Sequence, residues 1–436
     1  MEADAVVIGA GAAGLAAARS LASRSARVVL LEARDRAGGR VWWRSAPRGG
    51  VPAELGAEFI HGAAPRTMAL LREAGAAAVD LGGESWSRGP NGALVRDNAD
   101  FVEAARILER SRSFGADESV DAYLHRFDGD RALAQRVADA RLFVEGFEAA
   151  DPAIASVHSI ADELRSGVDS QSTRPLGGYA PAFDLLHRAC LAAGVELHFS
   201  SIVQRLWWRR GEVAVDAIGA GGDLRTIRAR VALVTVPAGV LKHRGDAAEL
   251  VFEPELPESK RVALAHIEMG HVIKIALWFR SAFWERVDHG RYRNAAFFRI
   301  GGAPIAAAWT QVPIRSDLLV TWAGGPRAEA LAGLSSEKRV ERALEELGGV
   351  FGAAEVRDEF ESALTHDWSA DRFSRGAYSY VTVGGGKARA TLAAPLDGTL
   401  FFAGEATSMD DQGGTVNGAL ESGERAAREA AQVLDG

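Results

Sequence analysis

The sequence predicts an α/β fold in which a parallel, nucleotide-binding sheet is interleaved with a second, α+β part built on a mixed sheet. The chain has 436 residues, more than a single hydrophobic core usually organises. It opens with a short apolar run that is followed by a glycine-rich turn and a helical stretch. Apolar runs of the same kind return in the middle of the chain and near its end. We therefore expect the two parts to alternate along the sequence.

The N-terminal segment predicts a strand, a helix, a strand and a helix in that order. Residues 5–8 and 28–31 are short, continuous apolar runs, as in parallel strands covered on both faces. Residues 12–24 between them are rich in Ala and Leu at helical spacing. Residues 64–75 predict a second helix, with a proline in its first turn and a glycine at its end.

The rest of the chain alternates between helical and strand-like patterns. A helical pattern runs from about 98 to 150, and a Pro/Gly break follows at 174–181. The further elements are expected as strands at 195–199, 201–208, 212–217, 227–236, 271–279 and 399–403, strand-like runs within 292–323, and helices at 182–193, 336–348 and about 416 to 433. The positions of the strands assign 1–63, 194–250 and 385–436 to the nucleotide-binding domain, and 64–193 and 251–384 to the substrate-binding domain.

Composition limits the partners and the compartment. The 50 basic and 58 acidic side chains give a net charge of -8, which disfavours nucleic acid and anionic membranes as partners. Cys190 is the only cysteine, so an intrachain disulfide and a cysteine-based metal site are excluded. The N-terminus lacks the basic and apolar regions of a signal peptide, and no apolar stretch reaches the ~18–20 residues of a membrane span. We expect a cytoplasmic monomer or homodimer without a metal.

A glycine turn follows the first predicted strand. Gly9, Gly11 and Gly14 form a GxGxxG motif between that strand and the next helix. The first glycine permits the tight turn, the second lets the backbone approach a pyrophosphate, and the third allows close helix–strand packing. Glu32 ends the second strand, where a carboxylate can accept hydrogen bonds from ribose hydroxyls. The motif predicts a dinucleotide site, and an ordinary Gly/Ala turn in an alanine-rich chain is the alternative.

A second glycine pair lies just beyond Glu32. In the segment EARDRAGGR (32–40), Arg34 and Arg40 stand on either side of Gly38 and Gly39. The glycines allow another close backbone approach, and two guanidinium groups complement the two charges of a diphosphate. An NAD dehydrogenase has no need of this second phosphate contact, so the segment favours FAD.

With these residues in place, the chain resembles the flavin amine oxidase superfamily over nearly its whole length. The motifs that carry the resemblance are EARDRAGGR (32–40), GAEFIHG (56–62), TVPAGVLK (235–242), GHVIKIALWFRSAFW (270–284), WSADRFSRGAYSYV (368–381) and FAGEATSMDDQGGTVNGALESGERAA (402–427). The wording of RGAYSYV and GTVNGA is most similar to polyamine oxidases and to the catalytic domain of the lysine-specific histone demethylase. The resemblance implies a Rossmann-type FAD-binding domain and a substrate domain with a mixed sheet.

The resemblance also implies how the cofactor is held. Monoamine oxidases bond the flavin through a cysteine at the position of Ala377, so we expect non-covalent FAD here. We expect Glu405 to accept from a ribityl or ribose hydroxyl. The positive end of the C-terminal helix, if aimed at the flavin, would stabilise the anion that forms there. The expected cofactor-binding residues are Gly9, Gly11, Gly14, Glu32, Arg34, Gly39, Arg40, Glu58, Val203, Trp368, Gly404, Glu405, Thr415 and Val416.

Lys274 lies inside a predicted strand, on the same face as Val272, Ala276 and Trp278. An ammonium on that face is either buried against a specific partner or extends from a sheet edge, and the pattern alone leaves both open. By resemblance, the partner is a water at flavin N5, and the lysine with its water assists the reoxidation of the flavin by oxygen.

Tyr378, His61 and Thr415 are the residues expected on the substrate side. Tyr378 resembles one wall of the aromatic cage that steers an amine toward the flavin, and Trp368 resembles a residue that packs near the ring. Monoamine oxidases have a second cage tyrosine at the position of Thr415. A cage with only one tyrosine favours a polyamine-oxidase-like or demethylase-like pocket. A histidine that matches His61 lies near the substrate amine in animal polyamine oxidases, and a structural histidine is the alternative. Glu58 is either a pocket anion or a flavin or helix contact.

These residues predict an FAD-dependent amine oxidase that uses a small-molecule amine, preferably a polyamine, and O2. Hydride transfer from the amine α-carbon to flavin N5 gives an imine, which is hydrolysed to an aldehyde plus an amine or ammonia, and O2 is reduced to H2O2. The nearest alternative is a monoamine oxidase for alkyl or aromatic amines. An L-amino-acid oxidase is disfavoured because such enzymes bind the substrate carboxylate through an arginine in the segment that corresponds to 56–62, and this segment has none. Protein demethylation is disfavoured because the chain has neither the extra N-terminal helical domain nor the long helical insertion of the demethylase. From another class, a flavin-binding scaffold without turnover is opposed by Lys274 and Tyr378.

Overall fold

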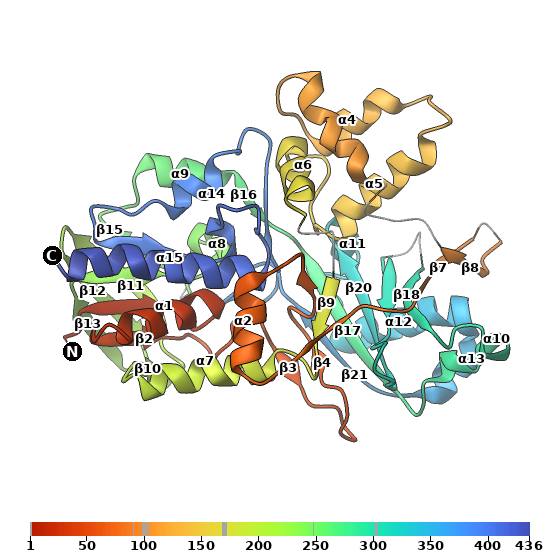
Figure 1. Ribbon diagram of the computed structural model, residues 1–436, viewed down its shortest axis with the longest axis horizontal. Helices are drawn as coiled ribbons and strands as arrows, with labels where there is room; N and C mark the ends of the chain where they lie inside the picture. Colours follow the sequence, from red (N-terminus) through yellow and green to blue (C-terminus); the bar gives the residue numbers. More distant parts are fainter. Residues whose placement is uncertain are drawn as a thin grey trace.

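The computed structural model describes residues 2–89, 91–97, 103, 105–167, 172–246, 248–300 and 304–436. They form two halves that lie side by side (Figure 1). One half is built around a parallel sheet and contains both chain termini, and the other is built around a large mixed sheet. The predicted α/β class is confirmed. Residues 98–102 and 104, within the predicted helical segment 98–150, lie outside the described residues.

The nucleotide half is built on five parallel strands in the order β10-β2-β1-β14-β23. Their bounds are β1 Ala5–Ile8, β2 Val28–Leu31, β10 Glu196–His198, β14 Val231–Val234 and β23 Leu400–Phe402. One face packs on α1 (Ala12–Ala22), α7 (Ala180–Ala192) and α15 (Val416–Leu434). Alternate residues of the same strands pack on a second sheet, so the strands are apolar on both faces.

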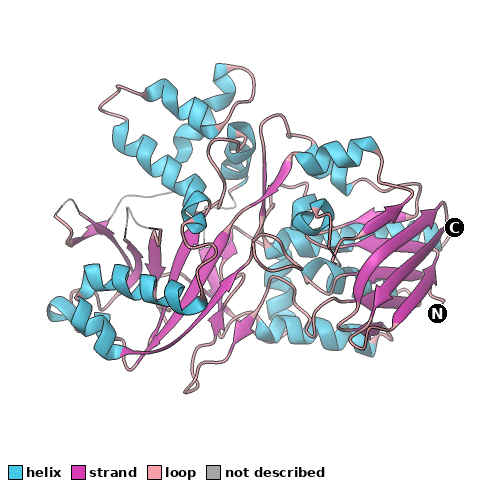
Figure 2. Ribbon diagram, turned by 180° about the vertical axis from the view of Figure 1, so that it is seen from behind, coloured by secondary structure: helices cyan, strands magenta, loops and turns pink. Residues whose placement is uncertain are grey.

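The second sheet of this half has the order β13-β12-β11-β15. Figure 2 shows the strands of this half at the right, near the two chain termini. Its strands are β11 Ile202–Arg209, β12 Glu212–Ile218, β13 Leu224–Ala229 and β15 Val251–Glu253. The single strand predicted at 227–236 is wrong, because the chain leaves the second sheet after β13 and enters the parallel sheet at β14. The change occurs at the exposed Arg230, which donates to the last carbonyls of α15. The alternating residues 227–230 and the apolar run 231–234 follow each other without a turn residue, so the sequence gives no sign of such a change of sheet.

The other half is built on a seven-stranded mixed sheet in the order β21-β17-β20-β19-β18-β7-β8. Its strands are β7 Glu84–Arg88, β8 Leu94–Asp97, β17 Val272–Phe279, β18 Ala295–Arg299, β19 Ala307–Trp309, β20 Leu318–Gly324 and β21 Phe360–Asp367. Helix α12 (Ser336–Phe351) covers one face. The other face packs on residues around 42–59, which lead from the glycine turns. Every residue of β17 is buried.

The remaining elements connect and cover these sheets. The helices are α2 Pro65–Glu73, α4 Val120–Leu124, α5 Ala134–Gly146, α6 Val157–Ser166, α8 Ala238–Lys242, α9 Glu258–Ala265, α10 Val287–Gly290, α11 Pro326–Glu329, α13 Ala353–Glu359 and α14 Ala388–Ala393. The short strands are β3 Trp43–Arg44, β4 Ala53–Glu54, β5 Ile60–His61, β6 Ala78–Asp80, β9 Ser172–Pro175, β16 Ile267–Met269 and β22 Ser379–Val381. Strand β9 overlaps the predicted break at 174–181 and lies with α2 between the halves (Figure 1). Within the described ranges, no helix has both the length and the apolar character to cross a bilayer. The exact division into two domains stays a prediction.

Candidate active site

The turn after β1 has the conformation that its glycines permit. Gly9 has a φ of +105°, and a Cβ on Gly14 would lie 1.8 Å from the carbonyl oxygen of Gly9, so neither position accepts a side chain. The carboxylate of Glu32 accepts from the backbone N–H groups of Ala10 at 2.7 Å and Arg34 at 2.8 Å. No side chain caps the first turn of α1, so none competes for its positive end.

A second backbone turn lies directly against the first. The N–H of Gly38 donates to Ala10 at 2.8 Å, and a Cβ on Gly39 would lie 3.2 Å from the Cα of Gly11. Arg36 fixes this turn by donating to the carbonyl oxygen of Gly39 at 2.9 Å, and burial lowers the pKa of Arg36 to about 10. Sequence reasoning missed Arg36, because a contact with the backbone of its own turn leaves no pattern. The two side-chain-free turns form a cradle, called here the glycine cradle, that fits a diphosphate.

Arg34 and Arg40 join this cradle to distant segments. Arg34 makes two 2.9 Å bonds to the carboxylate of Asp371. Arg40 donates to the carbonyl of Ala377 at 2.7 Å and to Glu405 at 2.8 Å. Both guanidinium groups thus tie 32–40 to the 368–381 and 402–427 segments, while their contacts with phosphate stay predictions.

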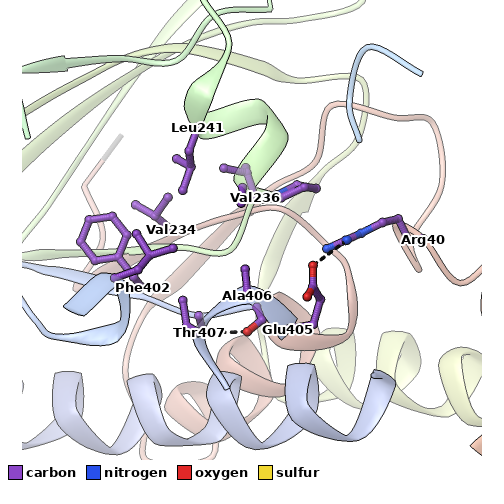
Figure 3. A pocket seen from close by; sticks show the side chains of 13 residues that line it. Arg40, Val234, Val236, Leu241, Phe402, Glu405, Ala406 and Thr407 are labelled. Atoms are coloured by element: carbon purple, nitrogen blue, oxygen red, sulfur yellow. Dashed lines mark hydrogen bonds and ion pairs between the residues drawn. The ribbon is translucent and has the colours of Figure 1, made fainter. Parts of the chain in front are cut away.

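Glu405 lies at a pocket where β14 and β23 end (Figure 3). The labelled walls of the pocket are Arg40, Val234, Val236, Leu241, Phe402, Glu405, Ala406 and Thr407. The second oxygen of Glu405 accepts from Ser379 Oγ at 2.6 Å and from the N–H of Gly414 at 3.0 Å. Burial favours the protonated acid, but the charges of Arg40 and Arg389 and these hydrogen bonds outweigh burial, so the pKa of Glu405 lies below its ordinary value. Beside it, Gly404 has a φ of +136° and would direct a Cβ into open space.

Thr415 caps the start of α15. Its Oγ1 accepts from the N–H of Gly418 at 2.9 Å and donates to Gln412 at 2.8 Å, and Val416 is the first helical residue. A Cβ on Gly414 would lie 3.3 Å from the ring of Tyr378. The positive end of the helix therefore lies beside this tyrosine.

Tyr378 and His61 meet at Phe147, which follows α5. The Tyr378 hydroxyl donates to the carbonyl of Phe147 at 2.5 Å, and the His61 ring lies 4.9 Å from the Phe147 ring. Burial lowers the pKa of His61 to about 4, so its imidazole is neutral at pH 7, with Nδ1 3.1 Å from Ser172 Oγ. Burial also raises the pKa of Tyr378. Sequence reasoning missed Phe147, because one Phe in a helical stretch carries no motif.

Lys274 is fully buried and paired with Glu58. Its Nζ lies 2.5 Å from Glu58 Oε2, and it also donates to the carbonyl of Gly56 at 3.2 Å. Strand β17 runs between β20 and β21, which excludes a sheet-edge lysine. Glu58 also pairs with Arg174 of β9 at 3.0 Å. Sequence reasoning missed Arg174 because it stands in the predicted Pro/Gly break.

Trp368 and Val203, the other predicted cofactor contacts, are core residues. Trp368 is 2% exposed, and its indole N–H donates to the carbonyl of Leu55 at 2.9 Å. Val203 of β11 is 8% exposed and packs between the two sheets of the nucleotide half. Their cofactor contacts stay predictions. In the part of the chain that the structure describes, no cluster of His, Cys, Asp and Glu is placed to hold a metal ion.

By sequence, the chain matches a family profile and several individual relatives. Residues 12–431 match a family profile described as "Flavin containing amine oxidoreductase". The chain is 32% identical to Lysine-specific histone demethylase 1 homolog 1 of Arabidopsis thaliana, with 98% of this chain and 52% of that protein covered. It is 27% identical to Lysine-specific histone demethylase 2 of Homo sapiens, with 97% and 52% covered. The chain thus spans about half the length of these relatives.

Two solved structures share the fold along the whole chain. Wild-type putrescine oxidase bound to putrescine has a TM-score of 0.81 at 21% identity, with 100% of both chains covered. Cyclohexylamine oxidase from Brevibacterium oxydans IH-35A has a TM-score of 0.80 at 22% identity, again with 100% of both chains covered.

Proposed function

The chain belongs to the family of flavin-containing amine oxidoreductases, and from this premise we propose that it oxidises a small diamine or polyamine with O2. Membership of the family confirms the resemblance seen in the motifs and makes the protein an oxidoreductase. In the proposed reaction a carbon bound to nitrogen gives up a hydride, water hydrolyses the imine to an aldehyde plus an amine or ammonia, and O2 is reduced to H2O2.

The cofactor is a flavin, and the donor set fits its dinucleotide form, FAD. The glycine cradle suits a diphosphate, Glu32 suits the ribose, and the start of α15 suits an electron-rich ring edge. Bound FAD supplies the hydride acceptor and the route for electrons to O2. The thiol of Cys190 is buried in α7, where it donates to the carbonyl of Leu15 at 3.3 Å. Because Cys190 is the only cysteine, we expect FAD without a thioether link.

The convergence of Tyr378, His61 and the start of α15 around Phe147 is the observation that carries the proposal. At pH 7 both the imidazole and the phenol are neutral, so neither adds a net charge to the site. An amine that enters such surroundings is disfavoured as its ammonium and presents its lone pair. In this arrangement Tyr378 and His61 orient the nitrogen, and no charged base is required.

Two carboxyl groups beside this site support a substrate with a second amine. Glu148 lies close enough to Tyr378 to raise the pKa of its phenol further, after the larger effect of burial. Glu163 of α6 is hydrogen-bonded with Glu148, and burial raises the pKa of Glu163 to about 7. Glu163 also forms an ion pair with Arg389, at 3.5 Å. A distal ammonium would complement this pair of carboxyls, which favours diamines and polyamines over monoamines.

A second candidate is the oxidation of N-methylated lysine in a peptide. The sequence relatives named as histone demethylases favour it. The chemistry at the amine would be the same, and only the size of the substrate would differ.

A steady-state screen with detection of H2O2 tests the proposal. The FAD-loaded protein receives putrescine, spermidine, benzylamine or a peptide with dimethylated lysine. We expect turnover with the first two substrates and weaker turnover with benzylamine. Turnover of the peptide alone would replace the proposal with the second candidate, and no peroxide from any amine would refute oxidase function.

A further inference from the structure

Three buried charged side chains from three separate segments form a cluster with Glu58 at its centre. Lys274 of β17, Glu58 and Arg174 of β9 are 1%, 5% and 4% exposed. Lys274 Nζ lies 2.5 Å from one carboxylate oxygen, and the Arg174 guanidinium lies 3.0 Å from the other. Buried charges are stable only when they are paired, so the three charges depend on one another.

Each side chain in contact with the Glu58 carboxylate is a hydrogen-bond donor. Besides Lys274 and Arg174, the indole N–H of Trp309 donates at 3.0 Å and the amide of Gln311 at 3.4 Å. An amide at position 58 would turn an NH2 group toward at least one of these donors. Burial alone would raise the pKa of Glu58, but the charges of Lys274 and Arg174, with the hydrogen bonds, hold it below its ordinary value. The position therefore requires an ionised carboxylate.

The Lys274 ammonium is held on the side of the glycine cradle. It donates to the carbonyl of Gly56 at 3.2 Å. Gly56 packs on the backbone of Arg40, since a Cβ on Gly56 would lie 1.8 Å from the Arg40 carbonyl oxygen. That same oxygen accepts from the N–H of Ala57 at 3.2 Å. Arg40 is also the residue that directly follows the second glycine turn.

We propose that Glu58 is the positioning residue of Lys274, and that it fixes the ammonium toward the glycine cradle while Arg174 and Trp309 fix Glu58. This inference rests on the proposed oxidase function and on the role that the motif resemblance implies for Lys274, which is to assist the reaction of the reduced cofactor with O2. Two other titratable groups lie close to the ammonium. Glu54 of β4 acts on it electrostatically, and His366 of β21 is its cross-strand neighbour.

The test compares Glu58→Gln with the matched control Glu54→Gln. Both carboxyls are buried on the same segment, at 5% and 4% exposure, but Glu54 accepts from the backbone N–H of Tyr179 at 2.7 Å. The FAD-loaded proteins are reduced anaerobically by light, with oxalate as the electron donor and without any amine, and are then mixed with oxygenated buffer. We expect Glu58→Gln to slow reoxidation by about ten- to a hundredfold, since a misplacement of about 1 Å can cost about a hundredfold. The control removes a carboxyl that acts on Lys274 only electrostatically and makes no hydrogen bond to it, so it is expected to slow reoxidation much less than Glu58→Gln does.

A double-variant cycle with Lys274→Met separates positioning from packing. If Glu58 acts through Lys274, Glu58→Gln adds nothing to the slow reoxidation of Lys274→Met. Wild-type rates in Glu58→Gln, or losses that multiply in the double variant, overturn the proposal.

Unfolding of the FAD-free proteins by urea gives a readout without the cofactor. The midpoint of Glu58→Gln should fall, and Lys274→Met should partly restore it by removing the unpaired ammonium. An unaltered midpoint counts against the ion pair. If Glu58→Gln does not fold, Trp309→Phe removes one donor to Glu58 and must slow reoxidation in the same direction, and an unchanged rate overturns the proposal.

The use of light separates this inference from the proposed function. A wild-type protein that oxidises no amine, yet whose photoreduced flavin reacts with O2 in a Glu58-dependent way, contradicts the amine substrate and supports the positioning role. A wild-type protein that oxidises amines, but whose reoxidation does not depend on Glu58, supports the amine substrate and contradicts the positioning role.

Discussion

Replacing Gly11 by Ala tests whether the glycine cradle holds the cofactor phosphates. Gly11 has a φ of -77° and a ψ of -172°, which any residue adopts. The nearest atom to an added Cβ is the Cα of Gly39 at 4.0 Å, an ordinary contact. The poorer N-cap and the stiffer unfolded chain oppose each other, so the free energy of unfolding of the FAD-free protein should change by no more than about 1 kcal/mol.

The added methyl group nevertheless occupies the space between the two turns, where the diphosphate is expected. Overpacking of one methyl group costs about 1–3 kcal/mol, which corresponds to a Kd for FAD that rises about 5- to 150-fold. The Kd is measured by titrating the FAD-free protein and following flavin fluorescence. Urea unfolding of the same protein reports its stability.

Gly82→Ala is the matched control, because a Cβ there has no atom within 4 Å and the residue lies before β7 in the other half. It should leave the Kd unchanged. A Gly11→Ala protein that is folded and binds FAD as tightly as the wild type would refute the placement of the phosphates at this turn.

Three further changes test the helix cap, the carboxyl pair and the histidine. Thr415→Ala removes the side chain that accepts from Gly418 and should lower the free energy of unfolding by about 1 kcal/mol, whereas Thr415→Ser should retain it in urea titrations. Glu163→Gln should raise the KM for putrescine about tenfold, the equivalent of about 1.4 kcal/mol, and leave the KM for benzylamine unchanged. Since the pKa of Glu163 is raised to about 7, the wild-type KM for putrescine should fall as the carboxylate forms above that pH, and Glu163→Gln should lose this pH dependence. The pKa of His61 is 6.5 in the unfolded chain and about 4 in the folded protein, so between these pH values the unfolded chain binds the proton more readily and the free energy of unfolding falls as the pH falls. In urea titrations across this range, His61→Asn should therefore lose less stability than the wild type.

Local features of the fold could be predicted from the sequence because each depends on neighbouring residues. The apolar run that becomes β17 and the start of α15 at Val416 were both predicted within a residue or two of their ends. The first glycine turn could be placed because Gly9 has a positive φ and because a Cβ on Gly14 would meet the carbonyl oxygen of Gly9, only a few positions earlier. Such elements follow from periodicity and turn chemistry alone.

The features that could not be predicted depend on contacts between distant parts of the chain. Glu58 and Lys274 are 216 positions apart, and Arg34 and Asp371 are 337 apart, so no local pattern links them. Likewise, only the folded chain shows that Arg174 is buried in β9. The same holds for Phe147, which contacts both Tyr378 and His61. The sequence could identify Glu58 and Lys274 as candidates, but the ion pair between them needed the three-dimensional structure.

Anaerobic mixing of the FAD-loaded protein with putrescine tests the central claim most directly, because it isolates the transfer of electrons from amine to cofactor. The account predicts that the yellow colour of oxidised FAD disappears in a single turnover and that it returns, with H2O2, when O2 is admitted. A protein that takes up no FAD, or whose bound FAD stays yellow with putrescine and every other amine, would contradict the account.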